Sequence, residues 1–278
     1  MAYTNIDDPS AYFQTTLYTG AGAGQTVTNG GNSDLKPDFL WIKRRNAGYA
    51  HFVVDSNRGL GSSNPPYLEA DSTAAENSNQ NWISGVGTDG FTIGINEQNL
   101  SNTSGTYVAW QWKANGGTTA NNTTGSINSV VQANTDAGFS IITYTGNATN
   151  STVGHGLGVQ PSVIINKKRA ATASWSVWHS ALLGTQLLEL NTAGAIATVA
   201  AIWNSTVPTS SVFSIGTDGQ TNSNNTTYVT YAFAEKQGYS KFGKYVGNAS
   251  ADGPFVYTGF KPAWVMIKGA DVADDWYI

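Results

Sequence analysis

The chain of 278 residues contains no cysteine, so disulfide bonds, thiolate metal sites and cysteine nucleophiles are excluded. Charged residues make up only 12% of the sequence, and the net charge of −4 lacks the basic excess that nucleic-acid binding requires. No run of about 18 apolar residues occurs, so we expect no membrane insertion. The N-terminus has neither a basic region nor an apolar stretch, so we expect no signal peptide.

Glycine, asparagine, serine and threonine are abundant instead, with 31 glycines alone. The sequence also has nine Trp, 13 Tyr and 10 Phe, which supply enough apolar surface to form a core and argue against disorder. This combination predicts a protein with a polar surface and an aromatic core, most simply an all-β protein.

The sequence repeats itself, and the repeats keep the same order. A proline followed by an apolar run that closes on lysine occurs at residues 35–43, 159–167 and 260–268. A tyrosine two residues before a glycine occurs at 18–20, 144–146 and 245–247, and Tyr-Val-x-aromatic-x-aromatic occurs at 107–112 and 228–233. Gly-Thr-Asp-Gly is present at 87–90 and 216–219. We therefore expect tandem copies of one unit.

These repeats predict a first unit over residues 1–118 and a second over 130–236, joined by a flexible Gly/Asn/Thr-rich linker at 119–129. Residues 237–278 match only the beginning of a third unit. Half of a β-sandwich cannot bury its inner face. We therefore expect either that this chain is a fragment of a longer protein or that residues 237–278 pack on another subunit.

Alternating apolar and polar residues favour strands over helices throughout. The expected fold is all-β, with tandem antiparallel β-sandwich domains of jelly-roll or lectin-like type and few short helices. Asp89-Gly90 and Asp218-Gly219 are expected to form tight hairpin turns, and residues 181–190 and 193–203 are the candidate helical turns.

Residues typical of catalytic chemistry do not form a motif. The three histidines, His51, His155 and His179, lack metal-ligand spacing, and His155 lies in a glycine-rich turn. Four carboxylates of the first unit are candidates for a glycosidase pair, but most have no equivalent in the second unit. These are Asp55, Glu69, Asp71 and Glu76. We predict no catalytic residues, no cofactor, no metal site and no enzymatic activity.

Basic clusters at 43–45 and 167–169 occupy matching positions and are expected to be solvated strand ends. Most tryptophans lie in alternating strands and are expected to be core residues. Trp82 and Trp203 lie in less regular, polar stretches, so we take them as candidates for an exposed surface that stacks on sugars.

The sequence resembles virion structural proteins of tailed bacteriophages, particularly marine and cyanobacterial ones, of the repeated-domain, tail-fibre-like kind. The segments that carry the resemblance are residues 6–14, 36–46, 88–91, 107–114, 144–147, 154–158, 175–179, 244–248 and 259–265. The resemblance implies repeated lectin-like β-sandwich modules in a virion protein. The resemblance assigns no catalytic role to any residue of this chain.

The resemblance further implies a non-enzymatic virion component whose residues 1–13 attach it to other virion proteins. Its later modules would project toward a glycan or protein on the host surface. The alternatives are a decoration or fibre protein on the head and a polysaccharide-degrading tailspike. We expect a homo-oligomer, with a trimer as the expected stoichiometry, because closed assemblies protect exposed β edges.

Overall fold

The computed structural model describes residues 4–62, 64–78 and 81–278, so the first three residues of the predicted attachment segment lie outside it. The described residues form 20 strands, one α-helix and two 3-10 helices. The fold is mostly β, with several antiparallel sheets, as predicted. The helices are short, as predicted: α1 (Gly219–Asn222), η1 (Pro9–Ala11) and η2 (Ser56–Arg58).

Two antiparallel sheets form the first predicted unit, called unit 1 below. Its main sheet has the order β1-β8-β3-β4-β5 and its smaller sheet has the order β2-β7-β6. The main-sheet strands are β1 (Phe13–Thr19), β3 (Phe39–Arg44), β4 (Phe52–Asp55), β5 (Leu68–Glu69) and β8 (Thr106–Trp112). The smaller sheet contains β2 (Gln25–Val27), β6 (Ile83–Val86) and β7 (Phe91–Ile93).

The second predicted unit, unit 2, repeats this arrangement with additions. Its eight-stranded sheet runs β16-β15-β14-β13-β18-β11-β10-β9, and β12 pairs with β17. The segment β11-β18-β13-β14-β15 has the strand order of the main sheet of unit 1. The bounds are β9 (Ala120–Asn122), β10 (Ser129–Asn134), β11 (Phe139–Thr145), β12 (Ser151–Gly154), β13 (Val163–Lys168), β14 (Ser176–His179), β15 (Gln186–Glu189), β16 (Ala197–Thr198), β17 (Val212–Ile215) and β18 (Thr227–Phe233).

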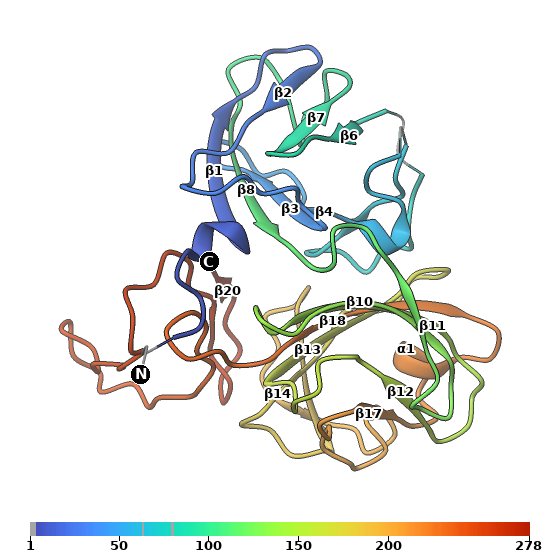
Figure 1. Ribbon diagram of the computed structural model, residues 1–278. Coiled ribbons are helices and arrows are strands. Elements are labelled where there is room, and N and C mark those ends of the chain that lie inside the picture. The colour runs from blue at the N-terminus through green and yellow to red at the C-terminus, as the bar shows by residue number, and fades with distance from the viewer. Residues whose placement is uncertain (1–3, 63, 79–80) are drawn as a thin grey trace.

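Residues 237–278, called the third block, contain only the two-stranded pair β19 (Ile267–Lys268) and β20 (Trp276–Tyr277). Figure 1 shows unit 1 above unit 2, with the third block beside both and close to the N-terminal segment.

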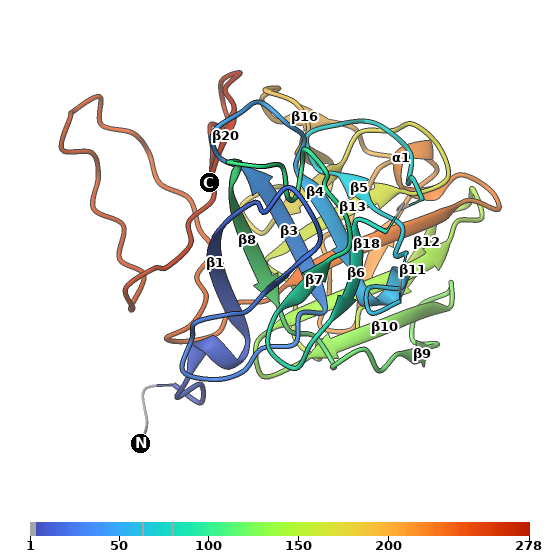
Figure 2. The same cartoon turned by 90° about the horizontal axis from the view of Figure 1, so that it is seen from above.

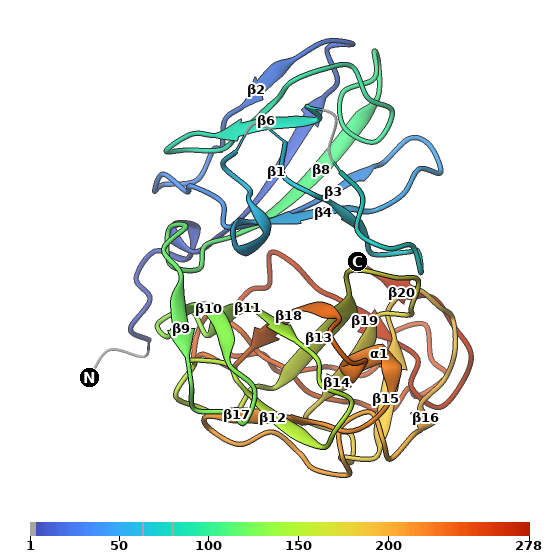
Figure 3. The same ribbon diagram turned by 90° about the vertical axis from the view of Figure 1, so that its right-hand side faces the viewer.

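Each main sheet has apolar side chains on both faces. In β3, Leu40 and Ile42 are fully buried against the smaller sheet of unit 1. The alternate residues Phe39 and Trp41 belong to a second core cluster, which unit 2 shares. The two main sheets therefore pack against each other, and the smaller sheets cover the outside (Figures 1 and 3). The result is four stacked β layers.

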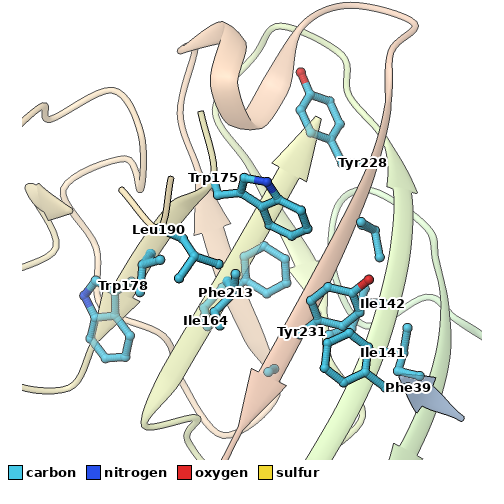
Figure 4. Packing of buried hydrophobic residues seen from close by; sticks show 14 of the residues in the cluster. Phe39, Ile141, Ile142, Ile164, Trp175, Trp178, Leu190, Phe213, Tyr228 and Tyr231 are labelled. Atoms are coloured by element: carbon cyan, nitrogen blue, oxygen red, sulfur yellow. The ribbon is translucent and has the colours of Figure 1, made fainter. Parts of the chain in front are cut away.

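Aromatic rings fill the space between the two main sheets. The ring centroids of Phe39 and Tyr231 lie 4.4 Å apart, and those of Phe39 and Phe139 lie 5.9 Å apart. Figure 4 shows Phe39 approaching Tyr231 and Ile141 from the opposite unit. Because large aromatic side chains dominate core energetics, this shared cluster holds the two units together, while unit 1 has a second cluster of its own under its smaller sheet.

A stacked tyrosine pair marks equivalent positions in the two units. Tyr18 and Tyr107 stack at 5.1 Å in unit 1, and Tyr144 and Tyr228 stack at 5.1 Å in unit 2. The Tyr107 hydroxyl donates to the carbonyl oxygen of Gln98 and accepts from a backbone N–H. Tyr228 does the same with Gly219 and Ser223. The Tyr-Val-x-aromatic-x-aromatic repeat thus predicts equivalent strands correctly.

The Gly-Thr-Asp-Gly repeat does not mark equivalent positions. Asp89-Gly90 lies between the paired strands β6 and β7, and Gly90 has φ +103°, as a hairpin turn requires. Asp218 instead follows β17 and caps α1, accepting from the N–H of Gln220, so the predicted hairpin there is wrong. A cap and a hairpin turn favour the same residue types, which explains the error.

Two further expectations differ from the structure. The candidate helical turns at 181–190 and 193–203 contain β15 and β16 with intervening turns. The segment 119–129, expected to be a flexible linker, contains β9, which pairs with β10 at the edge of the eight-stranded sheet. The side chains of this edge strand are mostly exposed, so side-chain periodicity gives no signal for it.

The buried hydroxyl of Tyr228 provides a test of the repeated tyrosine pair. Replacing Tyr228 with Phe leaves the N–H of Ser223 and the carbonyl of Gly219 without this partner, so we expect a loss of about 1–3 kcal/mol in the free energy of unfolding. Denaturant titration measures it. Tyr257→Phe, at a side chain 72% exposed, is the control and should change stability by less than about 0.5 kcal/mol. Equal effects of the two variants would contradict the role of the hydroxyl.

Candidate functional site: the junctions between the repeated parts

A buried ion-pair network joins unit 1 to unit 2. The side chains of Asp55 and Arg58 are fully buried, and Arg58 Nε lies 2.6 Å from Asp55 Oδ2. Arg58 also contacts Glu76 at 3.0 Å, and Glu76 accepts two hydrogen bonds from Arg169 of unit 2. The Tyr231 hydroxyl, also from unit 2, donates to Asp55 Oδ2 at 2.6 Å. Both units therefore complete the same network.

Local structure holds Arg58 in place. Asp55 is the last residue of β4 and caps η2, accepting from the backbone N–H of Arg58. Asn57, between them, donates two hydrogen bonds to carbonyl oxygens of Val130 and Ile141 in unit 2. The turn that ends β4 thus presents side chains to the opposite unit.

Burial and charge act in opposite directions on these groups. Burial alone would lower the pKa of Arg58, but Asp55, Tyr231 and Glu76 outweigh it and raise that pKa above its ordinary value. Burial alone would raise the pKa of Glu76, but the hydrogen bond from Arg169 and the charge of Arg58 lower it. Arg58 and Glu76 are therefore held in their charged forms.

A second junction contact uses backbone acceptors and occurs twice in the chain. In unit 2, Lys167 Nζ donates to the carbonyl oxygen of Thr73 in unit 1 at 2.9 Å. The N–H of Ala173 donates to the same oxygen at 3.0 Å. Trp175 Nε1 donates to the carbonyl oxygen of Glu69 at 2.9 Å. We call this set of three hydrogen bonds the junction contact.

The third block makes the junction contact on unit 2. Lys268 Nζ and the N–H of Asp274 both donate to the carbonyl oxygen of Ala193, at 3.0 and 2.8 Å. Trp276 Nε1 donates to the carbonyl oxygen of Glu189 at 2.9 Å. The donors lie at the sequence positions equivalent to those in unit 2, and the acceptors at those equivalent to unit 1. Each part therefore binds the preceding part in the same way.

The lysine of the junction contact also supports its own loop. Lys167 donates to the carbonyl oxygen of Ala173, Lys268 to that of Asp274, and Lys43 of unit 1 to that of Tyr49. Burial, with Lys168 as a smaller cause, lowers the pKa of Lys167 to about 8. The cluster at 167–169, expected to be a solvated strand end, is thus partly buried in the junction.

Aromatic contacts also link the third block back to unit 1. Phe13 of β1 lies 6.4 Å from Trp264, measured between ring centroids. Phe139 and Phe39, which occupy the positions equivalent to Phe13 and Trp264, make the corresponding contact between unit 2 and unit 1 at 5.9 Å. The three parts therefore contact one another in a cyclic order around a common centre.

The structure places the two tryptophans that were predicted as surface candidates in different environments. Trp203 is only 2% exposed and belongs to the core, so its prediction as an exposed binding residue is wrong. It lies in a turn whose neighbour Ile202 accepts hydrogen bonds from Gly216 and Thr221, and its irregular sequence context gives no sign of this burial. Trp82 is half-buried and packs against Tyr67 and Phe52 at 4.7 and 5.9 Å.

The four candidate carboxylates lie in two different settings. Asp55 and Glu76 both pair with Arg58 in the junction between the units. Glu69 belongs to β5, and burial, with the charge of Asp71 as a smaller cause, raises its pKa. Asp71 accepts from the backbone N–H of His51. Asp55 and Glu76 thus join the two units, and Asp71 supports a loop of unit 1.

The histidines have structural partners. His51 Nδ1 accepts from Trp41 Nε1 at 2.9 Å, and burial lowers the pKa of His51 to about 4. His155 is fully buried, and its Nδ1 accepts from the N–H of Leu157 within the glycine-rich turn. His179 Nδ1 accepts from the N–H of Ala181. In the described ranges, no group of three or more His, Asp or Glu side chains is placed to hold a metal ion.

Two open surface hollows have polar linings. One lies on the smaller sheet of unit 1, has a volume of about 470 Å³, and is lined in part by Gln25, Asn81 and Thr92. The other lies along β10 and β11, has a volume of about 460 Å³, and includes Thr143 and Arg169. They do not occupy equivalent positions in the two units. No helix in the described part of the chain is long and apolar enough to cross a membrane.

Removing the central cation should destabilise the unit 1–unit 2 junction. Arg58→Met leaves Asp55 and Tyr231 buried without their counter-charge, so we expect a loss of about 3–5 kcal/mol in the free energy of unfolding. Lys241→Met is the control: its pair with Glu235 is exposed, with side chains 44% and 40% accessible, and contributes about 1 kcal/mol or less. Denaturant titration distinguishes them, and similar losses would refute the importance of the network.

The lowered pKa of Glu76 predicts a specific pH dependence. Its pKa in the folded state lies below the ordinary value of 4.5, so its stabilising effect is complete above about pH 4.5 and is lost as the pH falls through the lowered value. The stability difference between wild type and Glu76→Gln should therefore be constant near neutral pH and shrink in acid. Denaturation from pH 7 down to about pH 3 measures it. A difference that stays constant into acid would contradict the assignment, and Glu235→Gln serves as the exposed control.

Comparison with known proteins gives one result. No curated protein and no solved structure matches the chain. A family model described as a domain of unknown function (DUF7483) matches residues 8–278, and the chain therefore belongs to this family.

Proposed function

We propose that the protein is a non-enzymatic structural component of a bacteriophage particle, tail-fibre-like, whose modules project toward the host surface. The repeated junction contact is the observation that carries this proposal. It joins successive modules through directional hydrogen bonds and a shared aromatic core, which favours a fixed orientation of neighbouring modules over a hinge between them. A rigid array of similar modules suits a fibre protein, which must hold its outer modules at a fixed place and withstand mechanical force.

We further propose that each unit is a lectin-like β-sandwich module. Two features support this: in unit 1 the smaller sheet faces the main sheet across a core cluster, and in unit 2 the strands β12 and β17 play the same part. Few side chains are charged, and the hollow on unit 1 is lined by amide and hydroxyl groups. Such groups suit weak hydrogen bonding to a host glycan or protein, and repetition converts weak contacts into avidity.

The charged groups favour a structural role over hydrolysis. A glycosidase needs one protonated and one ionised carboxyl group that face the substrate. Asp55 is fully buried and faces Tyr231 of the neighbouring unit, and Glu76 is bound by two arginines. We therefore do not propose a polysaccharide-degrading activity for these residues.

The N-terminal segment is the proposed attachment to other virion proteins. Ile6 is buried, Asp8 caps η1 and Phe13 packs against Trp264, so residues from Ile6 onward also serve the fold. A deletion that tests attachment should therefore stop at Asn5. A homotrimer remains the proposed assembly, and the molar mass of the purified protein in solution checks it.

Labelling purified phage particles with a gold-tagged antibody against this chain tests the proposal. We expect gold on fibres or the tail, and we expect loss of incorporation when residues 1–5 are deleted. The control is Asp252→Asn, an exposed change far along the chain, which should leave incorporation unchanged. Gold spread over the head would indicate a decoration protein instead. Particles without gold, despite a positive blot of infected cells, would refute a virion role, and normal incorporation after the deletion would refute the attachment site.

A further inference from the structure

The hollow along β10 and β11 lies on the face of unit 2 that packs against unit 1, and we call it the junction hollow. Ile141 of β11 lies toward Phe39 of unit 1. Because side chains alternate between the faces of a strand, Thr143 and Thr145 lie on the same face as Ile141. Thr227 of β18 lies opposite Thr145 and shares this face. Figure 2, the view from above, shows β9, β10 and β11 reaching past the strands of unit 1.

Hydroxyl groups line the junction hollow without partners from the protein. Within the described residues, no hydrogen bond joins the hydroxyl groups of Thr143, Thr145 or Thr227 to another protein group. Thr145 and Thr227 are cross-strand partners, so their Cβ atoms lie about 5 Å apart, and Thr143 lies about 7 Å further along β11. Each hydroxyl group can donate one hydrogen bond and accept two. The hollow therefore suits a ligand that both donates and accepts at several points, as a polyhydroxylated molecule does.

The charges beside the junction hollow cancel one another. Arg169 lines the hollow, and its guanidinium group donates two hydrogen bonds to Glu76, at 2.9 and 2.8 Å. Glu76 also pairs with Arg58, whose other carboxylate partner is Asp55. Two arginines and two carboxylates make up this network, so an anionic ligand would meet no surplus of positive charge. The hollow therefore favours an uncharged ligand.

The floor of the hollow is formed before any ligand binds. Strand β11 pairs with β10 on one side and with β18 on the other, and the β-branched threonines have restricted rotamers. Val130 of β10 lies opposite Thr143 and is 36% exposed, which adds an apolar surface for the C–H groups of a ring. The volume of about 460 Å³ is within the range of small-molecule sites. A preformed site binds its ligand at a lower entropic cost.

The repeat does not account for the junction hollow. The strand of unit 1 that corresponds to β11 is β1, which forms the edge of its sheet, so in the described part of unit 1 no strand takes the place of β10. Leu17 of β1 occupies the position of Thr143 and is 61% exposed. The hydroxyl groups and the second strand of the floor are therefore features of unit 2 alone.

We propose that the junction hollow binds a short, uncharged oligosaccharide, with Thr143, Thr145 and Thr227 as its hydrogen-bonding residues and Val130 beneath a sugar ring. The host surface as the source of this sugar rests on the proposed function, whereas the binding itself does not. An added peptide strand fits less well, because β10 and β11 are each paired on both sides and leave no free edge.

Methyl NMR on the full chain with labelled threonines tests this site. The probes are three uncharged trisaccharides: maltotriose, cellotriose and mannotriose. We expect at least one of them to shift the methyl signals of Thr143, Thr145 and Thr227 saturably, with a dissociation constant on the order of millimolar. Thr198 is exposed in β16, at the far edge of the same sheet, and its signal should not move.

Threonine-to-valine variants separate hydrogen bonding from shape. Thr145→Val combined with Thr227→Val keeps the branched shape of both side chains and removes both hydroxyl groups. We expect the double variant to bind about tenfold more weakly, because two hydrogen bonds are lost. Thr198→Val, the same change outside the hollow, should leave binding unchanged. An unchanged melting temperature of the double variant shows that its fold is intact.

Several results would overturn the proposal. One is the absence of any shift at Thr143, Thr145 and Thr227 with all three sugars up to about 50 mM. Equal binding by the double variant is another, as are shifts confined to Thr26 and Thr92, which line the hollow on unit 1. Tighter binding of a glucuronic-acid trisaccharide that weakens with salt would indicate a charge-driven site instead.

The gold-labelling experiment separates this proposal from the proposed function. Particles without gold, together with sugar binding by the purified chain, would refute the virion role and leave the sugar site in place. Gold on fibres or the tail, together with unmoved threonine signals, would refute the sugar site alone.

Discussion

The fold depends on one constraint: each main sheet carries apolar side chains on both faces and cannot be covered by its own unit. The smaller sheet buries one face, as it does at Leu40. The other face, with Phe39 and Trp112, needs a neighbouring sheet. Hydrophobic burial is not directional and does not by itself fix how two sheets are oriented. The ion pairs of Arg58 and the junction contact supply that direction, because hydrogen bonds have defined geometry.

Several parts of this architecture could be predicted from the sequence. The Pro-apolar-Lys segments locate β3 and β13 and the region of β19, and the Tyr-Val-x-aromatic-x-aromatic segments locate β8 and β18. The repeats are visible in the sequence because equivalent strands of the two units pack against equivalent neighbouring strands. The same residue types are therefore needed in both units. The segment 237–278 shares motifs with units 1 and 2 for the same reason, and Lys268 and Trp276 bind unit 2 as their counterparts bind unit 1.

Other parts could not be predicted, because they depend on contacts between distant residues. Lys167 and Lys43 have similar neighbours in sequence, but only Lys167 reaches a carbonyl oxygen of another unit. Trp203 lies in a polar stretch and is nevertheless buried by strands that are remote in sequence. The Asp-Gly pairs at 89 and 218 are identical locally, yet one forms a hairpin and the other begins a helix. A single sequence records residue types and not the partners that decide between these outcomes.

The bond between Asp55 and Tyr231 joins residues that are 176 positions apart. During synthesis, unit 1 is therefore complete long before the sheet of unit 2 that covers the second face of its main sheet exists. At ribosomal speeds the delay between Trp112 and Phe233 is on the order of ten seconds. Throughout that time Phe39, Trp41 and Trp112 face water on a nascent chain. The same aromatic face that unites the finished molecule is thus its main hazard for aggregation and its main candidate for chaperone binding while it is being made.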